Sequence, residues 1–94
     1  MNVNFTPTAR ADLKAIRAYI SEFDDAAADR VISRIRQAAQ MFESFPLLGR
    51  AGEIENTREL TIPGLPYIIV YAIASETEID VLTIIHGRQQ YPPA

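Results

Sequence analysis

One apolar segment near the C-terminal end, residues 67–73, constrains the fold of this chain more than any other feature. It reads Tyr-Ile-Ile-Val-Tyr-Ala-Ile and is apolar on both alternating faces. This composition, rich in β-branched and aromatic residues, is typical of a central β-strand covered on both sides. Residues 75–78 are polar, and a second apolar run follows over residues 79–85. Because the polar interval is too short for anything but a reversal, the two runs predict a β-hairpin.

A further strand precedes this hairpin. Residues 60–62 alternate apolar with polar, and the Pro-Gly-Leu-Pro sequence of residues 63–66 supplies turn-forming residues directly after them. Proline presets the backbone for the second position of a turn, and glycine tolerates a positive φ. The C-terminal half therefore predicts a three-strand meander.

The N-terminal half predicts a short strand and two helices. Residues 2–5 alternate as in a strand, and Thr6 followed by Pro7 is a helix N-cap with proline at the first helical position. Apolar residues then recur at helical spacing over about residues 7–21 and again over about residues 25–45. Asp24 or Asp25 caps the second helix and Pro46 ends it. The second apolar stripe comprises Ala27, Val31, Ile35, Ala38, Ala39, Phe42 and Phe45.

The predicted order is β-α-α-β-β-β. A short link between the helices predicts a helical hairpin that packs on one face of a small, mostly antiparallel sheet, which is an α+β architecture. Residues 47–53 contain two glycines without clear periodicity and are predicted to be a loop. With 94 residues and 48% hydrophobic content, residues 1–94 are expected to form one domain with its own core.

Composition excludes several classes of protein. The chain has no cysteine, so disulfides and thiol-ligated zinc are excluded, and a cytoplasmic location is the simplest expectation. One histidine and dispersed carboxylates give no metal-ligand spacing, and no glycine-rich phosphate loop is present, so no cofactor is predicted. A net charge of −3 argues against direct sequence-specific binding of nucleic acid. No leader pattern or apolar run of about 20 residues predicts export or a membrane span.

Four short motifs follow one another in a characteristic order. They are Pro46-x-x-Gly49-Arg50, Arg58-Glu59-Leu60, Pro66-Tyr67-Ile-Ile-Val-Tyr71 and Ile85-His86-Gly87-Arg88-Gln89-Gln90-Tyr91-Pro92. With the preceding helical hairpin they resemble the RelE/ParE family of toxins from type II toxin–antitoxin systems, and the last two motifs resemble its ParE-like branch. The resemblance spans nearly the whole chain. It implies a small bacterial toxin that is neutralised by a cognate ParD-like antitoxin in a toxin–antitoxin hetero-oligomer.

The ribonuclease branch of the family is understood to cut messenger RNA on the ribosome, with cations on the sheet that polarise the scissile phosphate. Where that branch typically carries cations, this chain has Glu59, Thr61, Ile68 and Gln89. Arg58, His86 and Arg88 are the remaining candidates for catalysis if the chain is a ribonuclease. A histidine at a strand end is more often an edge-of-core residue than a general base.

The ParE-like branch is understood to bind DNA gyrase and trap its cleaved-DNA intermediate without catalysis of its own. We expect this chain to act in that way, with a ribosome-dependent ribonuclease and an inactive antitoxin-binding relic as the alternatives. The residues expected to bind the target are Arg58 and the C-terminal Arg88, Gln89, Gln90 and Tyr91.

The register of the hairpin decides which side chains face the antitoxin. If Ser75 opposes Glu78, then Ile68 lies opposite Ile85 and Tyr67 lies opposite His86. One face then carries Ile68, Val70, Val81, Thr83 and Ile85, and the other carries Tyr67, Ile69, Tyr71, Leu82, Ile84 and His86. The bulkier second set is assigned to the helices. The residues expected to bind the antitoxin on the open face are Ile68, Val70, Val81 and Ile85, with a docked helix or an added strand as the two possible modes.

Overall fold

The chain folds into a five-stranded sheet and a helical hairpin, and the computed structural model describes residues 1–89 and 91–92. The elements are β1 (Asn2–Phe5), α1 (Pro7–Ser21), α2 (Asp25–Gln40), the 3₁₀ helix η1 (Met41–Glu43), β2 (Arg50–Ala51), β3 (Thr57–Thr61), β4 (Tyr67–Ile73) and β5 (Glu78–His86). The strand order is β1-β5-β4-β3-β2, with β1 parallel to β5 and the other pairs antiparallel. The predicted α+β architecture is confirmed.

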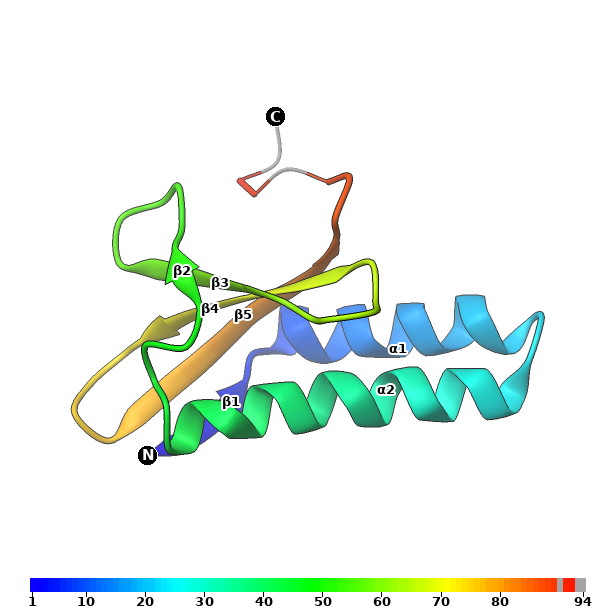
Figure 1. The fold of residues 1–94 in the computed structure, drawn as a ribbon, viewed down its shortest axis with the longest axis horizontal. Coiled ribbons are helices and arrows are strands. Elements are labelled where there is room, and N and C mark those ends of the chain that lie inside the picture. Colours follow the sequence, from blue (N-terminus) through cyan, green and yellow to red (C-terminus); the bar gives the residue numbers. More distant parts are fainter. Residues whose placement is uncertain (90, 93–94) are drawn as a thin grey trace.

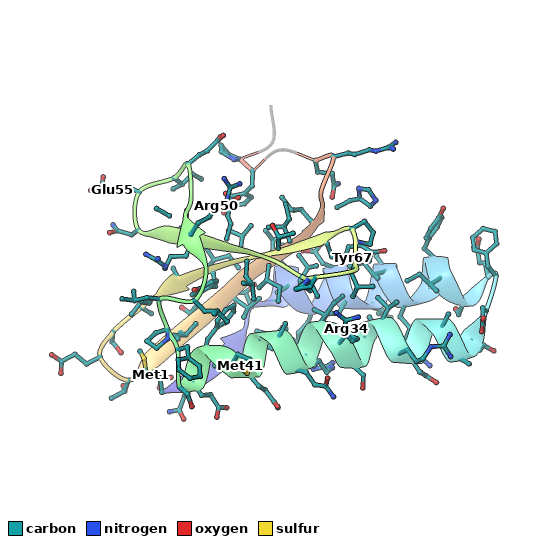
Figure 2. The ribbon with its side chains drawn as sticks, in the orientation of Figure 1. Met1, Arg34, Met41, Arg50, Glu55 and Tyr67 are labelled. Atoms are coloured by element: carbon teal, nitrogen blue, oxygen red, sulfur yellow. The ribbon has the colours of Figure 1, made fainter. Side chains whose placement is uncertain are left out.

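The helices form one layer and the sheet forms the other. Figure 1 shows α1 and α2 side by side beneath the sheet, with the tip of the helical hairpin extending beyond the strands. From the end of β5 the chain turns upward, away from the helices (Figure 1). Arg34 of α2 donates a hydrogen bond to the carbonyl of Pro63, which ties the β3–β4 turn to the helical layer (Figure 2).

Both helices begin where the sequence predicts. The Thr6 side chain accepts a hydrogen bond from the Ala9 N–H at 3.1 Å, and the Asp24 carboxylate accepts one from the Ala27 N–H at 3.1 Å. Each cap satisfies a backbone donor that the first helical turn leaves unpaired. Asp24, rather than Asp25, is therefore the cap of α2.

The second helix ends earlier than predicted. The sequence predicts a helix to Phe45, but α2 stops at Gln40 and tightens into η1, leaving the Phe45 side chain 56% exposed. The residue before a proline is disfavoured in the helical conformation, so Pro46 disfavours a helical Phe45. The apolar stripe that enters the core is consequently shorter than expected, with Ala28, Ile35, Ala39 and Phe42 buried.

The segment predicted to be a loop contains a short strand. Arg50 pairs with Glu59 and Ala51 with Arg58, which adds β2 to the edge of the sheet. Two residues are too few to show the alternation by which strands are recognised in a sequence. Gly49, just before β2, is required by close packing, because a Cβ there would lie 2.8 Å from both the Glu59 carbonyl oxygen and the Tyr71 ring.

The register of the β4–β5 hairpin changes partway along its length. The predicted pairs Ile68–Ile85 and Tyr67–His86 are confirmed. Between Val70 and Tyr71 the register shifts, so that Tyr71 opposes Val81 and Leu82 becomes an extra residue in β5. Such a β-bulge moves the following side chains to the other face. The predicted position of Val81 on the open face is therefore wrong, because Val81 is fully buried in the core.

Tyr71 joins the core to the loop that follows the helices. Its ring stacks on Phe42 with centroids 3.7 Å apart. Its hydroxyl donates to the Pro46 carbonyl at 2.9 Å and accepts from the Gly49 N–H at 2.8 Å. Both rings belong to the buried core, which comprises Ala9, Leu13, Ile35, Ala39, Phe42, Ile62, Tyr67, Ile69, Tyr71, Ile79, Val81 and Ile84.

We expect Tyr71→Phe to lower the free energy of unfolding by about 1–3 kcal/mol, because it leaves the Pro46 carbonyl and the Gly49 N–H without their buried partner. Urea unfolding measures the change. Tyr19→Phe is the matched control, since the Tyr19 side chain is 64% exposed, and it should change stability by less than about 0.5 kcal/mol. Equal stability of Tyr71→Phe and the wild type would contradict this role for the hydroxyl.

Candidate partner-binding groove and C-terminal tail

A groove of about 1220 Å³ runs along the outer side of α1 and the C-terminal half of β5. It is lined by Thr6, Thr8, Asp12, Ala15, Ile16, Tyr19, Pro66, Tyr67, Leu82, Thr83, Ile84, Ile85, His86, Gln89 and Tyr91. The α1 residues among these recur every three or four positions, so they form one face of the helix. Leu82, the extra residue of the β-bulge, is half-buried in this lining.

Side chains cover the edge of β5 inside the groove. The pairing with β1 reaches only as far as Val81. Beyond it, the Thr6 hydroxyl donates to the Leu82 carbonyl at 3.0 Å. Asp12 accepts a hydrogen bond from the Ile84 N–H at 3.1 Å and another from the Thr83 hydroxyl. These backbone groups are occupied, so this edge is a poor template for an added strand and the groove suits a helix better.

The tail leaves β5 through a tight turn at residues 86–89. The Gly87 N–H donates to the Pro66 carbonyl at 2.6 Å, and the Gln89 N–H donates to the His86 carbonyl at 2.8 Å. The Gln89 side-chain oxygen accepts from the His86 N–H at 2.6 Å, and the His86 Nδ1 accepts from the Arg88 N–H at 3.3 Å. The His86 ring also packs edge-on against Tyr67, with centroids 5.9 Å apart. His86 is therefore an edge-of-core residue whose Nδ1 accepts a hydrogen bond within the turn.

Tyr67 is the titratable residue whose environment is most clearly altered. Its side chain is 9% exposed and lies at the end of the sheet above α1 (Figure 2). Burial raises the pKa of the Tyr67 phenol above its ordinary value of 10.0, and the negative charge of ionised Tyr19 raises that pKa further. Tyr67 also lines the groove, and its phenol keeps its proton to a higher pH than an exposed tyrosine does.

The structure brings only some of the predicted target-binding residues together. Arg88, Gln89 and Tyr91 lie in the tail, and the last two line the groove. Gln90 lies outside the described residues. Arg58 lies elsewhere: it pairs with Tyr71 across the strands and thus shares the core-side face of β3. Its guanidinium donates to the Gly49 carbonyl at 2.9 Å and to the Leu47 carbonyl at 3.3 Å, which holds the loop before β2.

The predicted antitoxin-binding residues are also separated. Ile68 and Ile85 oppose each other and are half-buried, and Ile85 lines the groove. Val70 lies on the expected face but is fully buried, and Val81 is in the core. The sequence prediction missed Asp12, Tyr19 and Leu82. The signal for the α1 residues was the helical spacing of Thr8, Asp12, Ala15 and Tyr19, whereas Leu82 enters the groove through a bulge that no residue type marks.

The described residues contain neither a cluster of metal-binding side chains nor a membrane-spanning helix. Residues 1–89 and 91–92 contain no group of three or more His, Cys, Asp or Glu side chains that could hold a metal ion. Within the same residues, no helix is long and apolar enough to span a bilayer.

Comparison with known proteins gives consistent matches over nearly the full length. The model of the family described as ParE toxin of type II toxin–antitoxin system, parDE, matches residues 3–91. A protein of Sinorhizobium fredii, whose provisional name is toxin Y4kP, is 42% identical over 90 residues, covering 96% of this chain and 92% of the relative. Toxin RelE2 of Caulobacter vibrioides is 38% identical over 87 residues, covering 93% and 96%.

Solved structures share the fold. A structure of the chromosomal ParDE system from P. aeruginosa matches with a TM-score of 0.80 and 25% identity, covering 92% of this chain and 95% of the other. The RelBE2 toxin–antitoxin complex from Mycobacterium tuberculosis matches with a TM-score of 0.69 and 26% identity, covering 90% and 95%.

We expect Asp12→Ala to lower the free energy of unfolding by about 1–3 kcal/mol and to accelerate amide exchange at Ile84, because both hydrogen bonds to the carboxylate are lost. Asp12→Asn keeps an acceptor oxygen and should lose less. Glu76→Ala, on the exposed β4–β5 turn, is the control and should change neither quantity appreciably. Unchanged exchange at Ile84 in Asp12→Ala would show that the carboxylate does not cover this edge.

We expect the phenol of Tyr67 to have a pKa above its ordinary value of 10.0 in the folded protein. NMR measures this pKa from the chemical shifts of the ring as a function of pH. Its folded-state pKa is raised, so the unfolded chain loses this proton first as the pH increases. The stability linked to Tyr67 is therefore complete below the unfolded pKa and is lost as the pH rises above it. Tyr67→Phe should make stability less sensitive to alkaline pH, and Tyr19→Phe should move the Tyr67 titration to lower pH. Titration of Tyr67 at or below its ordinary value would disprove the assignment.

Proposed function

This chain belongs to the ParE toxin family of type II toxin–antitoxin systems, and on that premise we propose that it poisons DNA gyrase by trapping the cleaved-DNA complex. We further propose that a ParD-like antitoxin neutralises it. The observation that carries the choice of target is the chemistry of the open sheet face.

A carboxylate occupies the sheet face on which the ribonuclease branch would hold a scissile phosphate. Glu59 opposes Val70, and Thr61 opposes Ile68, so these four residues share that face. The Glu59 side chain is almost buried and pairs with Arg50 at 3.2 Å. Arg50 projects on the side of the sheet away from the helices (Figure 2). A buried carboxylate repels a phosphate and neutralises the neighbouring arginine, which disfavours phosphate chemistry on this face.

The tail offers a surface better suited to a protein target. Arg88 is exposed and Tyr91 is half-buried, and both follow the end of β5. Arginine and tyrosine are the residue types that most often dominate binding energy at protein interfaces. Poisoning by binding requires such contacts and needs no general base, which agrees with the engagement of His86 Nδ1 within the turn.

The groove is the proposed docking site of the antitoxin. Thr8 and Tyr19 of α1 lie eleven positions apart, or about 16 Å at the rise of an α-helix, which matches about three turns of a partner helix. Ile16, Leu82 and Ile84 provide an apolar floor for the apolar face of such a helix. The solved relatives include a toxin–antitoxin complex, which supports a partner of this kind. Because Gln89 and Tyr91 also line the groove, a docked antitoxin would cover part of the tail.

We expect purified protein to inhibit gyrase supercoiling and to accumulate cleaved DNA, and the product of the adjacent gene to reverse both effects. Arg88→Ala should raise the inhibitory concentration roughly tenfold, as for loss of one interfacial arginine. Arg30→Ala, an exposed arginine on α2, is the matched control and should inhibit like the wild type.

Two other outcomes would reject gyrase as the target. Ribosome-dependent cleavage of messenger RNA, abolished by alanine at Arg58, His86 or Arg88, would identify a ribonuclease. Binding to the antitoxin with no effect on gyrase, translation or growth would identify an inactive relic.

A further inference from the structure

Side chains, and not the backbone alone, close the turn formed by residues 86–89, here called the C-terminal turn. The backbone contributes the bond between the Gln89 N–H and the His86 carbonyl, at 2.8 Å. The side chain of each residue adds another bond: Gln89 accepts from the His86 N–H at 2.6 Å, and His86 accepts from the Arg88 N–H at 3.3 Å. A fourth bond, from the Gly87 N–H to the Pro66 carbonyl at 2.6 Å, fixes the turn to the sheet.

We propose that His86 and Gln89 are positioning residues that hold the C-terminal turn, and that Arg88 and Tyr91 make the contacts with the target. This inference rests on the proposed function, in which the tail is the target-binding surface. It reassigns Gln89, which the sequence placed among the target-binding residues.

The hydrogen bonds of Gln89 support a structural role. Its side-chain oxygen is already engaged with the N–H of the last residue of β5. The pairing of β5 with β1 ends at Val81, and beyond it the N–H groups of Ile84 and His86 donate to side chains. A backbone donor left unpaired is costly unless water or a side chain satisfies it. A partner that took this oxygen away from the His86 N–H would therefore open the turn.

The ring of His86 is held in the same manner. It packs edge-on against Tyr67, and its Nδ1 accepts the N–H of the residue two positions later. Asparagine and aspartate stabilise turns through the same local pattern. Acceptance at Nδ1 requires the neutral tautomer with its proton on Nε2. The ring thereby orients the backbone of Arg88, whose side chain is exposed.

The turn determines where the tail goes. If β5 continued as an extended strand, the five residues that follow His86 would carry Tyr91 about 16 Å beyond the end of the sheet. Instead Tyr91 lies back against the groove, which it lines together with Tyr19 and Tyr67. Loss of the turn would therefore remove Tyr91 from this surface and release Arg88 from its fixed position.

Two pairs of variants separate positioning from contact. Gln89→Met keeps the length of the side chain without an acceptor, and Gln89→Glu keeps an acceptor oxygen. His86→Phe keeps an aromatic ring against Tyr67 without an acceptor, and His86→Asn places an oxygen close to the position of Nδ1. Gln37→Met, on the exposed side of α2, is the control for the glutamine substitution.

The variants are measured by amide exchange, gyrase inhibition and growth arrest on expression without the antitoxin. Amide exchange should accelerate roughly tenfold at His86 in Gln89→Met and at Arg88 in His86→Phe, as expected for loss of one hydrogen bond. The inhibitory concentration should rise several-fold in both variants. Gln89→Glu and His86→Asn should restore exchange and inhibition together, and ¹⁵N shifts of wild-type His86 should report an unprotonated Nδ1.

Three results would overturn the proposal. One is loss of inhibition in both Gln89 variants with unchanged amide exchange, which would make Gln89 a target contact. Another is faster exchange with full inhibition and full growth arrest, which would make the shape of the turn irrelevant. The third is a wild-type protein that neither inhibits gyrase nor arrests growth. If the wild type arrests growth without acting on gyrase, only the choice of target fails, and growth arrest then tests the positioning roles.

Discussion

The buried contacts of Tyr71 hold together the parts of this molecule that the sequence separates. The ring stacks on Phe42 at the end of the helical layer, and the hydroxyl bonds to Pro46 and Gly49 in the loop that leads to β2. Arg58, its cross-strand neighbour, holds the same loop through two carbonyls. The end of α2, the start of β2 and the centre of the sheet are therefore fixed by one aromatic side chain and its neighbour.

The β-bulge beside Tyr71 determines which side chains of β5 lie in the core and which line the groove. A regular register would place Val81 on the open face and Leu82 against the helices. The shift instead buries Val81 with Tyr71 and leaves Leu82 half-buried at the groove. Because one residue of slip exchanges the faces of a strand, the β-bulge decides both which residues of β5 enter the core and which line the groove.

These features mark the limit of prediction from the sequence. The strands β3 to β5, both helix starts and the pairs near His86 follow from local patterns: alternation, capping residues and turn residues. The two-residue strand β2 and the bulge depend on tertiary contacts, so no local pattern announces them. The groove has the same origin, since it joins one face of α1 to a strand edge far away in the chain. The residue types of the tail suggest a contact surface, whereas the hydrogen bond between Gln89 and His86 is evident only from the structure.

The proposed choice of target depends on the distribution of charge over the fold. The sheet scaffold is intact, yet its open face carries a nearly buried Glu59 paired with Arg50, where phosphate chemistry would need unpaired cations. A carboxylate in place of a cation changes the local charge by two units. At Glu59 the carboxylate also pairs with the neighbouring Arg50. Arg88, which follows the end of β5, is exposed. The hydrogen bonds of the C-terminal turn are made by the backbone and by the side chains of Gln89 and His86, so they do not use the Arg88 guanidinium. Under the proposed function, a sheet face with a buried carboxylate and a tail held by the C-terminal turn suit a toxin that acts by binding a protein.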